Sequence, residues 1–238
     1  MSTFNYNDDI PQLSKVDISR HFNRHRVTKY FIDALVKLGK TDLKNYKVLE
    51  PGCGGGDKLR FFAEMNVPPE NCYGIEMSES GVDRCKRLSP AAMNFQVGDA
   101  MNMPFEENFF DIVVCSGLFG CFQDDNDVKR LSAQIDKVLK QDGVLLVPDL
   151  NHNYVDFYGQ NEAVMAKNLR GYNTETKELE NLLADRFRVI KQQPIFVVDV
   201  LLGGDGNPID IENYPLVDYQ IDQGVMKCSY SFWTFVKV

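Results

Sequence analysis

Long hydrophobic runs are absent from this 238-residue sequence, and no stretch approaches the ~18 apolar residues that a membrane-spanning helix requires. The first residues, MSTFNYNDDIPQLSK, lack the basic and then apolar layout of a signal peptide. Histidine is scarce, with 3 residues, and the 6 cysteines include no closely spaced pair of the kind that holds a metal. We therefore expect a cytoplasmic protein with reduced, mostly buried thiols and no metal site.

An excess of positive charge is also missing, because 34 acidic residues against 26 Lys and Arg give a formal net charge of −8. A general nucleic-acid binder needs a basic surface for phosphate contacts, so this balance argues against that class. One local exception is a cluster of cations and histidines near the N-terminus: Arg20, His21, Arg24, His25, Arg26 and Lys29. We interpret this cluster as the solvated face of an amphipathic helix, and a basic binding patch is the alternative.

The remaining composition is that of an ordinary globular protein, with 44% hydrophobic and 25% charged residues. The length suffices for one sizeable core, and no internal repeat or linker divides the chain. We expect a single domain over residues 1–238, with an N-terminal helical cap at 1–40. An insertion at 199–227 is expected between the last two strands.

Segments typical of strands and helices alternate through the first part of the chain. The expected strands are residues 46–50, 72–76, 94–97, 109–115 and 143–147, and the expected helices are 18–38, 57–65, 80–88 and 127–139. Strands that alternate with helices of about ten residues imply βαβ crossovers and a parallel sheet that is buried on both faces. A turn at Asp142-Gly143 is expected before the fifth strand.

The tail departs from this rhythm. Residues 174–183 are typical of a helix, whereas 187–190, 195–200 and 228–238 are typical of extended chain. The glycine-rich stretch 203–208 is the strongest loop signal in the protein. Two late strands with no helix between them predict an antiparallel hairpin that is added to the sheet.

A glycine cluster, Gly52-Cys53-Gly54-Gly55-Gly56, directly follows the first strand and opens a helix. Glycines let the backbone approach a ligand, and the helix N-terminus offers free N–H groups to a phosphate or a carboxylate. A P-loop needs Lys and then Ser or Thr after its last glycine, but Asp57-Lys58-Leu59 stands here. The dinucleotide fingerprint would place a glycine at Asp57. A tight turn without a ligand is the remaining alternative.

Acidic residues stand at the ends of three successive strands: Glu50, Glu76 and Asp99. Open α/β sheets bind ligands at the carboxyl edge of the strands, where these three side chains should meet. Glu50 is a poor neighbour for a pyrophosphate but suits an ammonium group. S-adenosylmethionine (SAM) carries an ammonium, a carboxylate and a sulfonium, and no phosphate. Glu76 would accept from its ribose hydroxyls and Asp99 from its adenine amine.

Together these features resemble the class I SAM-dependent methyltransferase family over about residues 46–150. The stretch 50–56 is similar to its first motif, Glu76 to its ribose-binding acid and Gly98-Asp99-Ala100 to its adenine motif. The resemblance implies an α/β fold of the Rossmann-like, doubly wound type. This fold has a seven-stranded, mostly parallel sheet, an antiparallel C-terminal hairpin and helices on both faces. It also implies SAM as the methyl donor and S-adenosylhomocysteine as the product.

Carried onto this sequence, the resemblance implies a cofactor site made of Glu50, Gly52, Cys53, Gly54, Glu76, Met77, Gly98, Asp99, Ala100 and Ser116. Met77 would pack on the adenine ring, the Ala100 N–H would recognise its edge, and the Ser116 carbonyl would accept from the ammonium. Many relatives carry histidines shortly after the fourth strand, where this chain has Gly120-Cys121. No histidine-dependent contact or base is therefore expected at that place.

The reaction leaves more alternatives open. His152, shortly after the fifth strand, is the candidate general base for an acceptor that must lose a proton, and a surface or structural histidine is the alternative. We expect a small-molecule acceptor that is methylated at O, N or C and is selected by the N-terminal helix, residues 153–158 and the insertion. A tRNA or protein methyltransferase is one alternative, and a non-catalytic SAM-fold binding module is another. The oligomeric state and the acceptor itself are not legible in the sequence.

Overall fold

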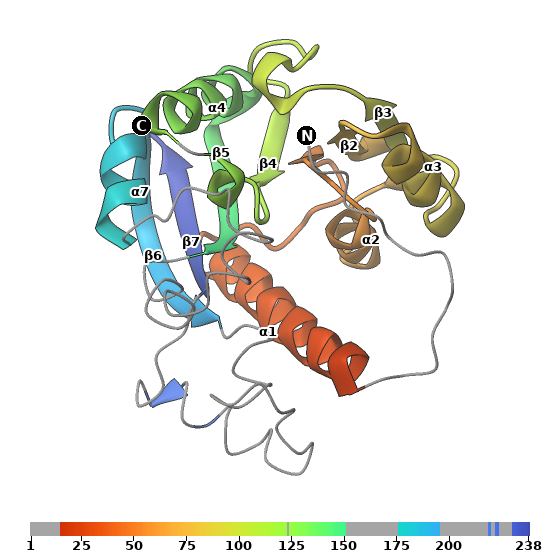
Figure 1. The fold of residues 1–238 in the computed structure, drawn as a ribbon, viewed down its shortest axis with the longest axis horizontal. Helices are drawn as coiled ribbons and strands as arrows, with labels where there is room; N and C mark the ends of the chain where they lie inside the picture. The colour runs from red at the N-terminus through yellow and green to blue at the C-terminus, as the bar shows by residue number, and fades with distance from the viewer. Residues whose placement is uncertain (1–14, 123, 151–175, 196–218, 220–221, 224–229) are drawn as a thin grey trace, which may run out of the picture.

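The computed structural model describes residues 15–122, 124–150, 176–195, 219, 222–223 and 230–238. Its centre is a seven-stranded sheet with the strand order β3-β2-β1-β4-β5-β7-β6 (Figure 1). The strands are β1 (Val48–Pro51), β2 (Cys72–Glu76), β3 (Asn94–Val97), β4 (Phe110–Val114), β5 (Leu139–Leu150), β6 (Phe187–Ile195) and β7 (Tyr230–Lys237). Strands β1 to β5 pair in parallel, whereas β7 pairs antiparallel with both β5 and β6.

Five α-helices surround the sheet in the described part of the chain: α1 (Lys15–Lys37), α2 (Asp57–Glu64), α3 (Glu79–Leu88), α4 (Asp125–Val138) and α7 (Thr176–Leu183). Short 3-10 turns are η1 (Pro69–Asn71), η2 (Ala100–Asn102) and η3 (Phe119–Cys121). Capping side chains fix two of the helix starts. The hydroxyl of Ser78 accepts from the Gly81 N–H before α3, and the Asp124 carboxylate accepts from two N–H groups at the start of α4.

Alternate residues of the central strands build two separate cores. Val48, Ile112 and Val144 face the core that includes side chains of α1, α2 and α3, while their successors in the chain face the core that includes α4 and α7. Figure 1 shows α4 and α7 side by side, away from α1 and α2. Both faces of the sheet are therefore covered, which explains why the strands are apolar runs and not alternating patterns.

Helix α1 is held to the sheet by aromatic packing. Phe31 is fully buried, and its ring centroid lies 5.5 Å from that of Phe62 on α2 and 5.4 Å from that of Phe232 on β7. The Tyr30 hydroxyl donates to the Pro194 carbonyl at 2.8 Å. The helix thus bridges α2, next to the glycine loop, and the antiparallel end of the sheet.

The predicted fold class and the antiparallel hairpin are confirmed by this topology. The predicted turn at Asp142-Gly143 is wrong, because these residues lie within β5. Phe110 pairs with Leu139 but Ile112 pairs with Val144, so the extra residues bulge out and the strand continues. Residues 187–195 likewise form one strand, β6, with a register shift after Val189, where we expected a break.

Several expectations lie on residues that the structure does not describe. They include the extended segment beyond residue 195 and most of the insertion at 199–227. Within the described ranges, no helix has the length and apolar character to cross a membrane.

Truncating Phe31 to Ala should lower the free energy of unfolding by about 3–5 kcal/mol, because it empties a fully buried aromatic site between α1, α2 and β7. Chemical denaturation measures this loss. Val36→Ala on the same helix is the control, since Val36 is 59% exposed and its truncation should change stability by less than about 0.5 kcal/mol. Equal effects of the two substitutions would contradict the packing of α1 described above.

Candidate functional site

The loop between β1 and α2 is built by glycines in the left-handed backbone region: Gly52 (φ 68°), Gly54 (φ 53°) and Gly56 (φ 71°). The N–H groups of Gly52 and Cys53 donate to the Ile75 carbonyl at 2.8 and 3.0 Å, which holds the loop against β2. A Cβ atom built on Gly54 would meet no atom within 4 Å. This part of the loop therefore presents bare backbone to open space that a ligand can enter.

Glu76, the last residue of β2, braces this loop. Its Oε2 accepts the Gly54 N–H at 3.0 Å, and its Oε1 accepts the Ser78 N–H at 3.2 Å. A carboxylate offers about four lone-pair sites, so each oxygen keeps acceptor capacity for a ligand hydroxyl. The sequence pointed to the acid but not to its contact with Gly54.

Glu50 is a carboxylate buried at the end of β1, with 1% of its surface exposed. The Lys58 ammonium lies 3.7 Å from Oε1, and Oε2 has no hydrogen-bond partner among the described residues. Burial raises the pKa of Glu50 to about 8, although the Lys58 charge acts in the opposite direction. Because a buried carboxylate oxygen without a partner is costly, the site favours an additional cation or N–H donor.

Asp57, the first residue of α2, joins the loop to α1. Its Oδ2 lies 2.9 Å from the Arg24 guanidinium, and its Oδ1 lies 3.2 Å from the Lys58 ammonium. Burial acts to raise the pKa of Asp57, but the Lys58 and Arg24 cations outweigh it and lower the pKa to about 2. Asp57 is thus a fixed negative charge that positions Lys58 beside Glu50.

Most of the described basic cluster on α1 is solvent-exposed, as we expected: Arg24, His25 and Lys29 are exposed, and Arg26 is the exception. Arg26 is 5% exposed, pairs with Asp222 and lies 5.7 Å from the Tyr30 ring centroid. Arg24 is engaged by Asp57. Arg26 departs from the expectation because helical periodicity does not reveal a partner such as Asp222, 196 residues further along the chain.

The third strand ends in the predicted adenine motif. Asp99 is exposed and caps η2, with its Oδ1 accepting the Met101 N–H at 2.8 Å. The Gly98 N–H donates to the Glu76 carbonyl at 3.0 Å, which brings this motif beside β2. Met77 is 67% exposed, and Ala100 is buried. An exposed methionine next to two strand-end acids is an apolar surface on which a flat ring can pack.

Asp149, near the end of β5, is a site residue that sequence reasoning missed. Its carboxylate is buried and accepts the Phe119 N–H at 2.9 Å and the Gly120 N–H at 3.2 Å. It therefore fixes the loop after β4, where the half-buried Ser116 lies. The signal that could have revealed Asp149 was the one used for Glu50 and Glu76, an acid at the end of a buried strand.

All ten residues of the predicted cofactor site lie at the carboxyl ends of β1 to β4, among strands that are neighbours in the sheet. Cys53 contributes only backbone, because its side chain is buried and its Sγ lies 3.8 Å from that of Cys85. His152 lies outside the described residues, so its role stays a prediction. Within the described ranges, no three His, Cys, Asp or Glu side chains gather as metal ligands would.

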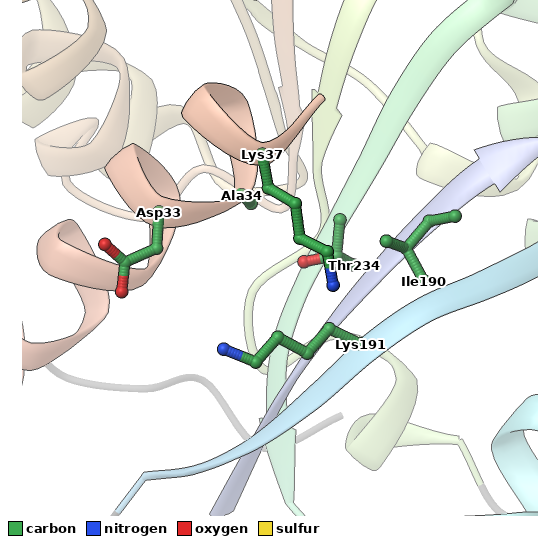
Figure 2. A pocket seen from close by; sticks show the side chains of 6 residues that line it. All are labelled: Asp33, Ala34, Lys37, Ile190, Lys191 and Thr234. Atoms are coloured by element: carbon green, nitrogen blue, oxygen red, sulfur yellow. The ribbon is translucent and has the colours of Figure 1, made fainter. Parts of the chain in front are cut away.

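A separate hollow lies between α1, β6 and β7 (Figure 2). Its walls come from Asp33, Ala34, Lys37, Ile190, Lys191 and Thr234, and its volume is about 20 Å³. A hollow of this size holds about one water molecule, so it is not a site for a cofactor or an organic acceptor.

Comparison with protein families gives a match to the model described as "Methyltransferase domain" over residues 49–147. Phthiotriol/phenolphthiotriol dimycocerosates methyltransferase 1 of Mycobacterium ulcerans is 28% identical over 146 residues, which cover 61% of this chain and 51% of that protein. Fatty-acid O-methyltransferase of Mycolicibacterium smegmatis is 28% identical over 155 residues, covering 63% and 53%. The chain thus spans about half the length of the curated relatives it matches.

Solved structures share the fold. The YcgJ protein of Bacillus subtilis superposes with a TM-score of 0.61 at 18% identity, covering 90% of this chain and 98% of that one. Magnesium protoporphyrin IX methyltransferase of Synechocystis, solved with bound S-adenosylhomocysteine (SAH), gives a TM-score of 0.66 at 13% identity, covering 97% and 90%. At these identities the similarity establishes the architecture alone.

Replacing Glu50 by Gln should remove a pH-dependent loss of stability. The pKa of Glu50 in the folded chain, about 8, exceeds the ordinary value of 4.5. The folded state therefore binds more protons than the unfolded chain between these values, so the stability from Glu50 is lost as pH rises through about 8. The stability of Glu50→Gln relative to wild type should rise by more than about 1.4 kcal/mol between roughly pH 5 and pH 9.

Denaturation at the two pH values measures this difference. Glu64→Gln is the matched control, because Glu64 is an exposed glutamate on α2. Its difference from wild type should stay within about 0.5 kcal/mol at both pH values. The same flat response from Glu50→Gln would refute the assignment of Glu50 as a strained buried acid.

Proposed function

We propose that this chain is a class I SAM-dependent methyltransferase, which transfers the methyl group of SAM to a small-molecule acceptor. The observation that carries the proposal is Glu50, a buried carboxylate with an oxygen that lacks a partner in the described structure, beside a glycine loop open to a ligand. A cofactor that brings an ammonium group and no phosphate suits this arrangement.

Each strand-end residue would bind a different part of the cofactor. Glu50 would face the cofactor ammonium, the backbone of the glycine loop would line the methionine part, and Glu76 would accept from the ribose hydroxyls. Met77 would pack on the adenine, and the Asp99 oxygen not held by Met101 would be available to the adenine amine. The bound cofactor supplies an activated methyl group on a sulfonium.

The chain's part in the reaction is then to align the acceptor with the methyl group. Proximity and orientation alone supply about 7–11 kcal/mol of barrier reduction. Asp149 contributes by holding the loop after β4 in one conformation through Phe119 and Gly120. His152 is the proposed base for an acceptor that must be deprotonated.

For the acceptor, we propose an oxygen nucleophile on a small apolar molecule. The names of two relatives, a fatty-acid O-methyltransferase and a phthiotriol/phenolphthiotriol dimycocerosates methyltransferase, favour a lipid-like class. The tRNA or protein alternative depended on the basic cluster of α1. Two of its cations, Arg24 and Arg26, are already engaged by Asp57 and Asp222, which weakens that alternative.

Calorimetry tests the cofactor site directly. Wild-type protein should bind SAM and SAH, and Glu76→Ala should bind both roughly tenfold to a hundredfold more weakly, because it removes a charged acceptor that also braces Gly54. Glu79→Ala, an exposed glutamate at the start of α3, should bind as wild type does. No binding by the wild type at about 100 μM SAM would overturn the proposal.

A transfer assay tests the acceptor class. Methyl-labelled SAM, incubated with free fatty acids and with long-chain alcohols, should give organic-extractable label as methyl esters or ethers. Bulk tRNA and protein should stay unlabelled. Label in tRNA with a steep dependence on salt would support the macromolecular alternative instead. Binding of SAM without transfer to any of a broad acceptor panel would support the non-catalytic module.

A further inference from the structure

Two cysteine side chains contact each other at the glycine loop between β1 and α2. Cys53 belongs to the loop and Cys85 to α3, and their Sγ atoms lie 3.8 Å apart. The side chains are 2% and 0% exposed, so they form a pair that is sealed from solvent. Neither the family resemblance nor the proposed methyl transfer assigns a function to this cysteine pair.

The pair is connected to the part of the loop that would hold the cofactor. The Cys85 thiol donates to the Gly54 carbonyl at 3.1 Å, while the N–H of the same glycine donates to Glu76 at 3.0 Å. Gly54 therefore takes its orientation from Cys85 on one side and from Glu76 on the other. A change at Cys85 would move the peptide groups that line the site.

We propose that Cys53 and Cys85 are a peroxide-sensitive modification site, whose disulfide closes the SAM site on the other side of the loop. This proposal rests on the proposed function only for its effect on SAM binding, because the formation of the disulfide is independent of that function.

In the first step the Cys85 thiolate attacks hydrogen peroxide, the O–O bond breaks, and a sulfenic acid and hydroxide form. In the second, the Cys53 sulfur displaces hydroxide from the sulfenic sulfur, and the S–S bond forms. The two thiols lose two electrons and two protons, and the peroxide becomes two water molecules.

The electrostatics favour Cys85 as the attacking group. Its hydrogen bond with Cys53 lowers the pKa of Cys85, and the nearby Arg60 and Arg84 guanidiniums act in the same direction, against the opposing effects of burial and of Glu76. The same hydrogen bond and burial raise the pKa of Cys53. A thiol of lowered pKa beside a resolving thiol is an arrangement that favours oxidation to a disulfide once peroxide reaches the pair.

The geometry explains why the disulfide would close the site. An S–S bond needs a separation of about 2.05 Å, so the sulfurs must approach by more than 1 Å beyond their present 3.8 Å contact. Cys53 Sγ already lies 2.7 Å from where a Cβ on Gly74 would stand, so the backbone of β2 limits its movement. Cys85 would have to give up its bond to Gly54, and the loop would follow. Burial of both sulfurs makes the reaction depend on opening of the loop, which a bound cofactor should suppress.

The test uses the full chain carrying Cys121→Ser, which removes an exposed thiol that would oxidise in the background. After treatment with about 100 μM hydrogen peroxide, a glutamate-specific protease should release peptide 51–64, with Cys53, joined to peptide 80–106, with Cys85. The joined mass should lie about 2 Da below the sum of the peptides, and dithiothreitol should separate them. No such species, or a disulfide between other cysteines, would overturn the proposal.

Calorimetry with SAM before and after peroxide measures the consequence. The oxidised protein should bind SAM at least tenfold more weakly than its own reduced form, and dithiothreitol should restore the binding. Saturating SAM during the treatment should slow the linkage. A Cys85→Ser variant, compared with its own reduced form, should respond less than about twofold to peroxide. A Cys53–Cys85 disulfide that leaves SAM affinity unchanged would refute the closing of the SAM site. A reduced protein that does not bind SAM would refute the proposed function, and the peptide mapping would then still test whether the disulfide forms.

Discussion

The structure depends on the burial of one carboxylate. Glu50 is the penultimate residue of β1, the strand between β2 and β4, and 1% of its surface is exposed. Burial raises the pKa of Glu50 to about 8, which favours its protonated form near neutral pH, at a cost that hydrophobic packing around it must offset. A cation on the ligand would offset this cost of burying Glu50, because it would pair with the carboxylate. The buried acid is then a binding determinant whose partner arrives with the cofactor.

Other contacts fix the position of Glu50 relative to the rest of the site. Asp57 holds Lys58 beside Glu50, and Arg24 joins the same group to α1. Glu76 fixes Gly54, and Asp149 fixes the loop after β4. Helix α1 is in turn anchored on the sheet by Phe31 and connected to the insertion through Arg26 and Asp222. Charge pairs and hydrogen bonds thus hold several of the segments that frame the carboxyl edge, which limits the conformations that the site can adopt.

Local patterns in the sequence sufficed for the fold class and for the similarity to SAM-dependent methyltransferases. The strands 72–76 and 94–97 are found as predicted, and Glu50, Glu76 and Asp99 lie along one edge of the sheet because parallel strands share one carboxyl edge. Contacts between distant segments were beyond local patterns. Arg26 is buried and pairs with Asp222, whereas the rest of the described basic cluster is exposed as expected. The bulge at Asp142-Gly143 is decided by pairing with β4. Asp149 was readable as a strand-end acid, but its role needed the position of the loop after β4.

The most direct test of this account is the number of protons released when SAM binds. Calorimetry at about pH 7 in buffers of different ionisation enthalpy measures this number. If the cofactor ammonium meets a Glu50 that is protonated in the apo protein, wild type should release close to one proton per SAM bound, and Glu50→Gln should release almost none. Equal proton release by the two proteins would contradict the central role of Glu50, even if both bind SAM.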